Sequence, residues 1–300
     1  MTQLDFTVEK IEAVTVDLPH ALAGSALMSP YVWQLDDGRY GMLARIVPPP
    51  GAPHPTTGSI WYAESPDGLH FTLGEAPVIA PGTGGLDPGG CEDPTLLTDG
   101  DRTLVYYTGV DADGSTGRLM LADGPDMHHL EKRGIALAST KTSGNTKEAT
   151  IDRTADGGWR LFYEYAYRDA SRIGLAIGDG ACGPWHEQPH PFSVREHAWD
   201  SWHLSTGPLL TTDKERPVMF YNGATRDARW RIGWVAFDAD YDRVVDRCIE
   251  PLIVPPPQPE RGMTDIAFAA SIIATGDLLY LYYSVADARL ARAHIRRFAF

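Results

Sequence analysis

The sequence has few cysteines and no long apolar run. Its three cysteines, Cys91, Cys182 and Cys248, lie far apart and form no C-x-x-C pair. This pattern argues against both a disulfide framework and a zinc knuckle. No apolar stretch is long enough to cross a bilayer, and the first twenty residues lack the charged and apolar regions of a secretory signal. We therefore expect a soluble protein of the cytoplasm.

Positive charge is also scarce. The 300 residues include 26 Lys and Arg against 40 Asp and Glu, which gives a formal net charge of −14. Such a charge repels nucleic-acid backbones and anionic membrane surfaces, so neither is an expected partner. Because 43% of the residues are hydrophobic and only 22% are charged, the chain can still bury a sizeable core.

Helical periodicity is nearly absent, and 30 glycines and 23 prolines interrupt the chain too often for long helices. What recurs is an apolar strand, a polar turn and a second strand that ends in aromatic residues. Five copies of this pattern occupy residues 30–45, 94–109, 149–166, 208–224 and 270–286. Their turns lie at intervals of 62, 57, 56 and 63 residues, counted between Gly38, Gly100, Gly157, Asp213 and Gly276. Regular spacing of this kind indicates an internal repeat.

Further strand pairs lie between the copies, so each unit predicts about four short antiparallel strands. The predicted fold is all-β, a single domain over residues 1–300. Five such sheets arranged around an axis form a five-bladed β-propeller, which leaves no long exposed edges. We expect the strand near residues 7–18 to close the ring by joining the last blade. In this geometry the residues just before each inner strand converge on the axis, and Asp93 is one of them.

Five motifs in order along the chain resemble those of glycoside hydrolase family 130. They are "CEDPTLLTDGDRTLVYYTG" (91–109), "WDSWHLSTGPLL" (199–210), "MFYNGATRDARWRIGWVAFD" (219–238), "EPLIVPP" (250–256) and "LLYLYYSVAD" (278–287). Each motif alone is weak, but their order over residues 25–293 is specific. The resemblance implies a five-bladed propeller that acts on β-mannosides.

The resemblance also implies that Asp93, in the "EDP" motif, is the general acid. A leaving sugar oxygen needs a proton, and a partly desolvated carboxyl group beside another acid, here Glu92, can hold one near neutral pH. The alternative is that Glu92 and Asp93 only cap a turn before a proline.

The nucleophile is the next question, because most well-known members of that family cleave with phosphate. A bound phosphate requires several converging cations. The phosphorylase pattern has a lysine after "W-D-S", a histidine in "Y-H-G" and an arginine at the end of the third inner hairpin. Here the corresponding stretches carry Trp202 and His203, Asn222, and Glu164. This departure resembles the hydrolase-like branch, in which glutamates act as the catalytic base.

Two glutamates are eligible as that base, Glu148 and Glu164, and the sequence does not choose between them. An inverting reaction would place the acid and the base about 6.5–9.5 Å apart. Two residues keep the phosphorylase alternative open. A small shift in the alignment would place Arg168 at one of the cation positions, and His203 is a second candidate cation.

Further residues are expected to contact the sugar because they match family positions or lie near the axis. They are Arg45, Glu92, Trp199, Asp200, Ser201, Trp202, His203, Asn222, Arg231 and Asp287. The competing interpretations are that Arg45 is a surface charge, that the acids bond to backbone groups of turns, and that the tryptophans pack in the core.

The predicted function is therefore an inverting, exo-acting β-mannosidase for short oligosaccharides, with β-1,2-linked mannose as a candidate substrate. No cofactor and no metal are indicated, and the oligomeric state, a homo-oligomer included, stays open. The alternatives are a β-mannoside phosphorylase, an arabinosidase-like or xylosidase-like propeller glycosidase, and a non-catalytic carbohydrate-binding propeller.

Overall fold

A computed structural model of the chain describes residues 4–83, 85–140, 144–256 and 265–299. These residues form β-strands, with one 3-10 turn, η1 (His20–Leu22), and no α-helix among them. In the same part of the chain no helix is long and apolar enough to cross a membrane. The all-β prediction is confirmed.

The strands fall into five antiparallel units, of which the first three follow the predicted pattern. Unit 1 contains β2 (Ala26–Gln34), β3 (Tyr40–Val47), β4 (Ser59–Ser65) and β5 (His70–Leu73). Unit 2 contains β6 (Gly90–Asp99), β7 (Arg102–Val110), β8 (Gly117–Gly124) and β9 (Glu131–Leu137). Unit 3 contains β10 (Gly144–Arg153), β11 (Trp159–Tyr167), β12 (Ala170–Gly178) and β13 (Trp185–Gln188).

Unit 4 has the same path but its strands are interrupted, so it divides into two short sheets. One contains β14 (His203–Ser205), β17 (Asn222–Ala224) and β18 (Trp230–Ile232). The other contains β15 (Leu209–Leu210), β16 (Val218–Met219), β19 (Val235–Phe237) and β20 (Val244–Arg247). Gly207 lies at the interruption, where an added Cβ would come within 1.9 Å of the Phe220 carbonyl oxygen. Only glycine permits so close an approach of two backbones.

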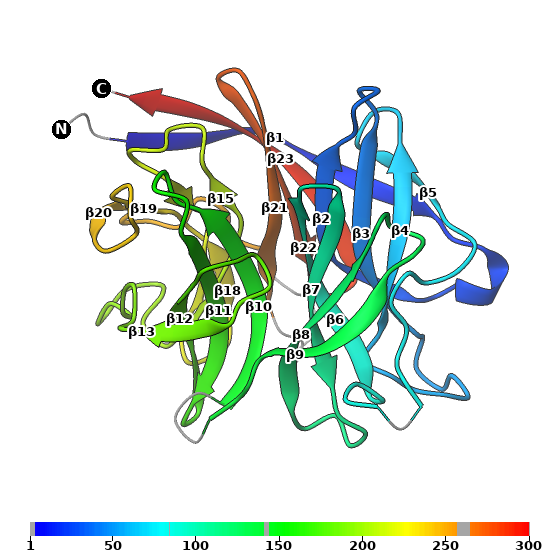
Figure 1. Cartoon of the computed structure of the whole chain (residues 1–300). Helices are drawn as coiled ribbons and strands as arrows, with labels where there is room; N and C mark the ends of the chain where they lie inside the picture. The colour runs from blue at the N-terminus through cyan, green and yellow to red at the C-terminus, as the bar shows by residue number, and fades with distance from the viewer. Residues whose placement is uncertain (1–3, 84, 141–143, 257–264, 300) are drawn as a thin grey trace.

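Unit 5 is built from both ends of the chain. It contains β21 (Ala267–Thr275), β22 (Leu278–Val285), β23 (Arg289–Ala299) and the amino-terminal β1 (Leu4–Asp17). β1 pairs antiparallel with β23 from Leu4 to Val14, and residues 15–17 then pair parallel with β5 of unit 1. Figure 1 shows β1 and β23 side by side and the two termini close together. The prediction that the amino-terminal strand joins the last unit is confirmed.

The first strands of the five units contact one another in a closed ring, in the order β2, β6, β10, β15, β21 and back to β2. The inner edges of these strands have no sheet partner, so their buried carbonyl groups need other donors. At every junction between units a side chain donates a hydrogen bond to such a carbonyl oxygen. The donors and the residues whose carbonyl groups accept are Tyr31 and Leu96 (2.9 Å), Thr95 and Ala149 (2.6 Å), Thr150 and Gly207 (3.0 Å), Asn222 and Ala269 (3.3 Å), and Ser271 and Pro30 (2.8 Å). A closed ring of four-stranded units is the arrangement that a five-bladed propeller requires.

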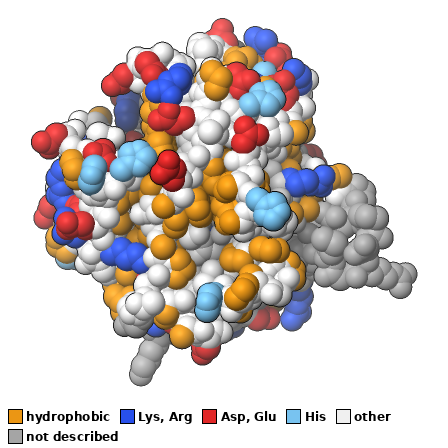
Figure 2. All heavy atoms as spheres, turned by 90° about the vertical axis from the view of Figure 1, so that its right-hand side faces the viewer, with side chains coloured by type: hydrophobic (Ala, Val, Ile, Leu, Met, Phe, Trp, Pro, Cys, Tyr) orange, Lys and Arg blue, Asp and Glu red, His pale blue; other side chains and the backbone are white. Residues whose placement is uncertain are grey.

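The core lies between neighbouring units. Unit 2 packs against unit 3 through one face and against unit 1 through the other, so its middle strands are buried on both faces. On β7 every residue from Leu104 to Val110 is buried. The aromatic residues that end the repeated hairpins fill this space, among them Tyr106, Tyr107 and Phe162. Figure 2 shows the outer side near β4 and β5, where hydrophobic side chains spread over the centre and charged ones gather toward the rim.

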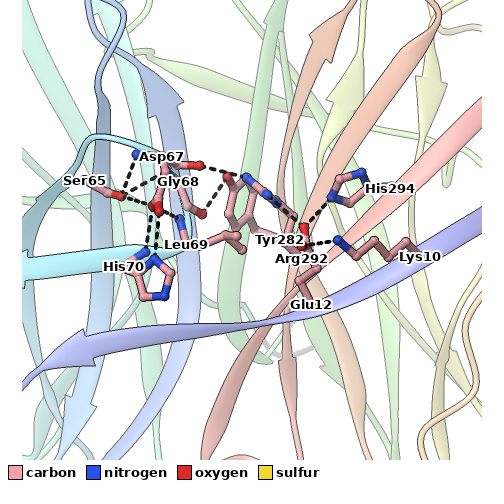
Figure 3. Close-up of polar contacts among 10 residues, drawn as sticks. All are labelled: Lys10, Glu12, Ser65, Asp67, Gly68, Leu69, His70, Tyr282, Arg292 and His294. Carbon is pink, nitrogen blue, oxygen red and sulfur yellow. Dashed lines mark hydrogen bonds and ion pairs between the residues drawn. The ribbon is translucent and has the colours of Figure 1, made fainter.

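A polar network joins unit 1 to unit 5 beside β1 (Figure 3). Arg292 donates to the Asp67 carbonyl oxygen (3.0 Å) and the Tyr282 hydroxyl donates to that of Gly68 (3.0 Å). Glu12 of β1 accepts a hydrogen bond from Arg292 (2.8 Å) and contacts His294 Nε2 at 2.5 Å. Because these bonds cross the closing seam, they link the two ends of the ring.

This network predicts a pH-dependent stability. Hydrogen bonds from Lys10 and Arg292 lower the pKa of Glu12 from 4.5 to about 2. The Glu12 carboxylate therefore stabilises the folded chain above about pH 4.5, and that contribution is lost as the pH falls toward 2. We expect Glu12→Gln to lower the melting temperature at pH 7 and the difference from wild type to close between pH 4.5 and 2.

The matched control is Glu9→Gln, because Glu9 lies on the same strand but pairs with Arg296 in a solvent-exposed position. Exposed ion pairs contribute little, so this variant should change the melting temperature less. Parallel pH profiles for wild type and Glu12→Gln would contradict the assignment.

Candidate active site

The first strands of units 1, 2 and 3, which are β2, β6 and β10, share the same local irregularity. The strand register shifts after Met28, after Glu92 and after Lys147, as in a β-bulge. The next residues, Ser29, Asp93 and Glu148, have φ angles of 50°, 48° and 53°. Bulges redirect side chains, and left-handed backbone is costly for residues other than glycine. The repeat therefore directs a hydroxyl group and two carboxyl groups into one place.

These side chains line a cavity of about 200 Å³. Its polar wall consists of Ser29, Arg45, Glu92, Asp93, Lys147, Glu148, Glu164, Ser171, Ser284 and Asp287, and its apolar wall of Met28, Trp230, Ile266 and Phe268. Pockets that hold drug-sized ligands measure about 300–1,000 Å³. A smaller cavity with a polar and an apolar wall suits a single sugar ring.

A larger cavity of about 650 Å³ lies beside β1 and β23. Its lining is mostly apolar, and Glu12 and Arg289 are the only charged residues that line it among those described. Glu12 is already bonded within the seam. The 200 Å³ cavity, in which five acids and two cations converge, is therefore the candidate active site.

Asp93 is held on two sides. Its Oδ1 accepts a hydrogen bond from the Ser29 hydroxyl at 2.6 Å and lies 3.7 Å from Arg45 Nη1. Arg45 in turn contacts Glu92 Oε1 at 2.7 Å and donates to the Thr57 carbonyl oxygen. The Asp93 side chain is only 6% exposed, so its position is well defined.

The surroundings of Glu92 and Glu148 favour protonated carboxyl groups. Burial raises the pKa of Glu92, although the charge of Arg45 opposes this. Burial and then the charge of Asp93 raise the pKa of Glu148 well above its usual range. Carboxyl groups that keep a proton near neutral pH are the groups that act as acids in catalysis.

Glu164 has a different environment. Its Oε1 lies 3.3 Å from Lys147 Nζ and accepts a hydrogen bond from the Ser171 hydroxyl at 3.0 Å. The charge of Glu164 is the chief reason that the pKa of Lys147 is raised far above its usual range. Lys147 is therefore charged, and it was missed by the sequence analysis. The only signal for it was its place beside Glu148, and both residues lie within β10.

The apolar wall is formed around Trp230. Its ring and that of Phe268 meet edge to face with centroids 5.3 Å apart, and the His203 ring lies 5.4 Å away. Aromatic faces of this kind pack against the apolar face of a pyranose.

Comparison with known proteins gives the family. The model for glycoside hydrolase family 130, described as β-1,4-mannooligosaccharide phosphorylase, matches residues 51–297. The chain belongs to glycoside hydrolase family 130. A β-1,2-mannobiose phosphorylase of Listeria innocua is 26% identical over 236 residues, which are 77% of this chain. The chain spans 64% of the length of that relative.

Solved structures of the family have the same fold. The Listeria innocua phosphorylase in complex with β-1,2-mannobiose superposes with a TM-score of 0.75 at 21% identity and covers 96% of this chain and 91% of its own. A structure from work on family 130 glycoside hydrolases that target β-1,2 mannosidic linkages in Candida mannan gives 0.73 at 24% identity, covering 90% and 84%. The family thus includes both phosphorylases and hydrolases.

Some of the residues expected at the site of this family 130 chain do meet there. The cavity brings together Arg45, Glu92, Asp93, Glu148, Glu164 and Asp287, of which Asp287 is the most exposed. His203 lies just behind the wall, where its Nδ1 accepts a hydrogen bond from the Ser171 backbone N–H at 3.1 Å. Burial lowers the pKa of His203, which favours the neutral ring.

The "WDSW" motif, in which four sugar contacts were predicted, does not line the 200 Å³ cavity. Trp199 stacks on Tyr221 with centroids 5.4 Å apart, and Trp202 packs under Arg226 at 4.5 Å. Asp200 is fully buried in an ion cluster, where it accepts from Arg195, Arg247 and the Tyr221 hydroxyl. Ser201 is half-buried and does not line the cavity. Trp230 takes the place in the wall that was expected for Trp199 and Trp202.

Arg231 and Arg168, two cations that the sequence offered for the site, also lie outside the cavity. Arg231 donates to the carbonyl oxygens of Trp199 and Arg229 and does not line the cavity. Arg168 is exposed and lies over the Tyr167 ring at 5.2 Å. The cations that line the cavity, among the described residues, are Arg45 and Lys147.

Asn222 was expected to contact substrate, but it is fully buried and bonded within the ring. Its amide donates to the carbonyl oxygens of Thr206 (2.6 Å) and Ala269 (3.3 Å), and its Oδ1 accepts from the Ala269 N–H (2.7 Å). A buried amide that satisfies three backbone groups joins unit 4 to unit 5.

We therefore predict that Asn222→Ala destabilises the fold and leaves sugar affinity nearly unchanged. The expected cost is about 1–3 kcal/mol for each backbone group left without a partner, visible as a lower melting temperature. Thermal unfolding and sugar titration of the variant check this. An unchanged melting temperature with weakened sugar binding would restore Asn222 as a substrate ligand.

No group of three or more His, Cys, Asp or Glu side chains is arranged to hold a metal ion in the described ranges. Three of the five acids of the cavity are instead paired with cations, Glu92 and Asp93 with Arg45 and Glu164 with Lys147. The chemistry that this arrangement offers is proton transfer between carboxyl groups and a bound substrate.

Proposed function

We propose that this chain is a five-bladed β-propeller enzyme that cleaves β-mannosides one terminal sugar at a time. The observation that carries the proposal is the meeting of Asp93, Glu148 and Glu164, from two neighbouring units, in one cavity of about 200 Å³. Membership of family 130 supports the substrate class, and relatives named for mannobiose support a short substrate. The size of the cavity supports an exo mode, because it suits one sugar ring.

Water is the nucleophile that the charge of the cavity supports best. Five carboxyl groups line it against two cations, and both cations already contact carboxylates. A phosphate dianion would enter beside this excess of negative charge, and uncompensated buried charge is costly. Glu164 adds repulsion where the phosphorylase pattern has an arginine.

The proposed reaction is a single displacement. Asp93 passes to the glycosidic oxygen a proton that it receives from the neighbouring, protonated Glu148, and the bond between that oxygen and the anomeric carbon breaks with its electron pair going to the oxygen. Glu164 takes a proton from water, whose oxygen bonds to the anomeric carbon from the opposite face. The product is inverted, which requires about 6.5–9.5 Å between the acid and the base.

Phosphorolysis is the second candidate, and the names of the relatives favour it. The family model and the Listeria innocua relative are both described as phosphorylases. In this version the acid is the same, and Arg45 with Lys147 would hold the phosphate. The two candidates differ only in what attacks the anomeric carbon.

The test is cleavage of β-1,2-mannobiose and β-1,4-mannobiose by the wild-type chain in phosphate-free buffer and with added phosphate. We expect mannose release at the same rate in both. Release only with phosphate supports the second candidate. Binding without cleavage supports a non-catalytic carbohydrate-binding propeller. Turnover of arabinosides or xylosides alone would show that these sugars, and not mannosides, are the substrates.

A further inference from the structure

We infer that Lys147 is a positioning residue that, together with Ser171, fixes the Glu164 carboxylate as the catalytic base. This inference rests on the proposed function and assigns the base, which the sequence left open between Glu148 and Glu164. Lys147 lies at 3.3 Å and the Ser171 hydroxyl at 3.0 Å from the same oxygen, Oε1 of Glu164. Glu164 Oε2 is thereby the oxygen left to accept a proton from water.

Glu148 and Glu164 differ in the groups that surround their carboxylates. The Glu164 side chain is only 5% exposed, and a buried carboxylate beside a cation is stabilised in its charged form. Glu148 follows Lys147 directly, but burial and the charge of Asp93 raise its pKa well above the usual range. Glu148, whose surroundings hold a proton, therefore belongs with the acid. Glu164, which Lys147 and Ser171 hold at one oxygen, belongs with the base.

Several groups from neighbouring elements act on Glu164. Lys147 and Glu148 come from β10, Ser171 from β12 and His203 from β14, and Asp93 of β6 lines the same cavity. Burial lowers the pKa of His203, so the neutral ring adds no charge at neutral pH. Lys147 is therefore the cation that offsets the acids on this side.

The test is the pH profile of kcat/KM for mannobiose in Lys147→Met, which keeps the length of the side chain and removes its charge. Without the cation the base loses its proton only at higher pH. We expect the acidic limb of the profile to move to higher pH. We also expect kcat to fall while KM stays nearly constant, and Lys147→Arg to restore the limb to within a fraction of a unit.

Lys214→Met is the matched control, because Lys214 makes a comparable ion pair, with Asp152 at 3.6 Å, on the exposed surface. Its profile should equal that of the wild type. An acidic limb that is unchanged in Lys147→Met would overturn the inference, and so would a loss that Lys147→Arg does not restore.

A second measurement needs no turnover. Carboxyl ¹³C NMR titrations of wild type and Lys147→Met, with Glu164→Gln to assign the signal, should show the Glu164 signal titrating at higher pH in the variant. Identical titrations would refute the role of Lys147 even if the chain cleaved no mannoside. An inactive wild type with a displaced titration would instead count against the proposed function alone.

Discussion

Replacing Asp93 by asparagine is expected to lower kcat for mannobiose cleavage by about 10²–10⁴-fold, the usual contribution of a general acid. The amide has no proton to give to the glycosidic oxygen. Asparagine is the appropriate replacement because it has the same size and tolerates the left-handed φ of 48° at this position. The melting temperature should change little, since the Ser29 hydroxyl can still donate to the side chain.

The substrate can separate a lost acid from a damaged site. An aryl mannoside whose leaving group departs as a stable anion needs no proton, so Asp93→Asn should lose much less activity on it. Asp99→Asn, at the exposed far end of the same strand, is the matched control and should behave as the wild type. Mannobiose turnover at the wild-type rate in Asp93→Asn would end the assignment of the acid.

Removal of the base should affect both substrates to the same extent. We expect Glu164→Ala to lower kcat by about 10²–10⁴-fold on mannobiose and on the aryl mannoside alike, because water needs activation in both reactions. Azide is a nucleophile that has no proton to lose. Added azide should therefore restore turnover of the aryl mannoside by Glu164→Ala and yield a mannosyl azide of inverted configuration.

Two variants serve as comparisons for this prediction. Glu187→Ala, exposed at the edge of the same unit, should retain full activity. Glu148→Gln should not respond to azide if Glu148 stays on the proton-carrying side of the cavity. If azide restored turnover to a Glu148 variant while Glu164→Ala kept full activity, Glu148 would be the base instead of Glu164.

The architecture was predictable because its signals are local. Alternation of apolar and polar residues and the turn residues of each hairpin depend only on neighbours in sequence, so the repeat, the all-β fold and the place of β1 followed from them. The interruptions of unit 4 were not predictable in this way. They depend on close approaches such as that of Gly207 to Phe220, which join residues distant in sequence.

The site was harder to predict, for a reason that Lys147 illustrates. In a regular strand neighbours point to opposite faces, so Lys147 and Glu148 should not share a cavity. The bulge and the positive φ of Glu148 bring both into it. Buried polar residues such as Asp200 and Asn222 cannot be told from ligands by sequence, because their partners come from other strands.

The most direct test of the central claim follows the oxygen that attacks the anomeric carbon. Wild-type chain is incubated with β-1,2-mannobiose in H₂¹⁸O that contains inorganic phosphate, and the products are analysed by mass spectrometry at early times. We predict that one of the two mannose molecules from each cleavage carries ¹⁸O, whatever the phosphate concentration. Formation of mannose 1-phosphate without ¹⁸O in the sugar would contradict hydrolysis.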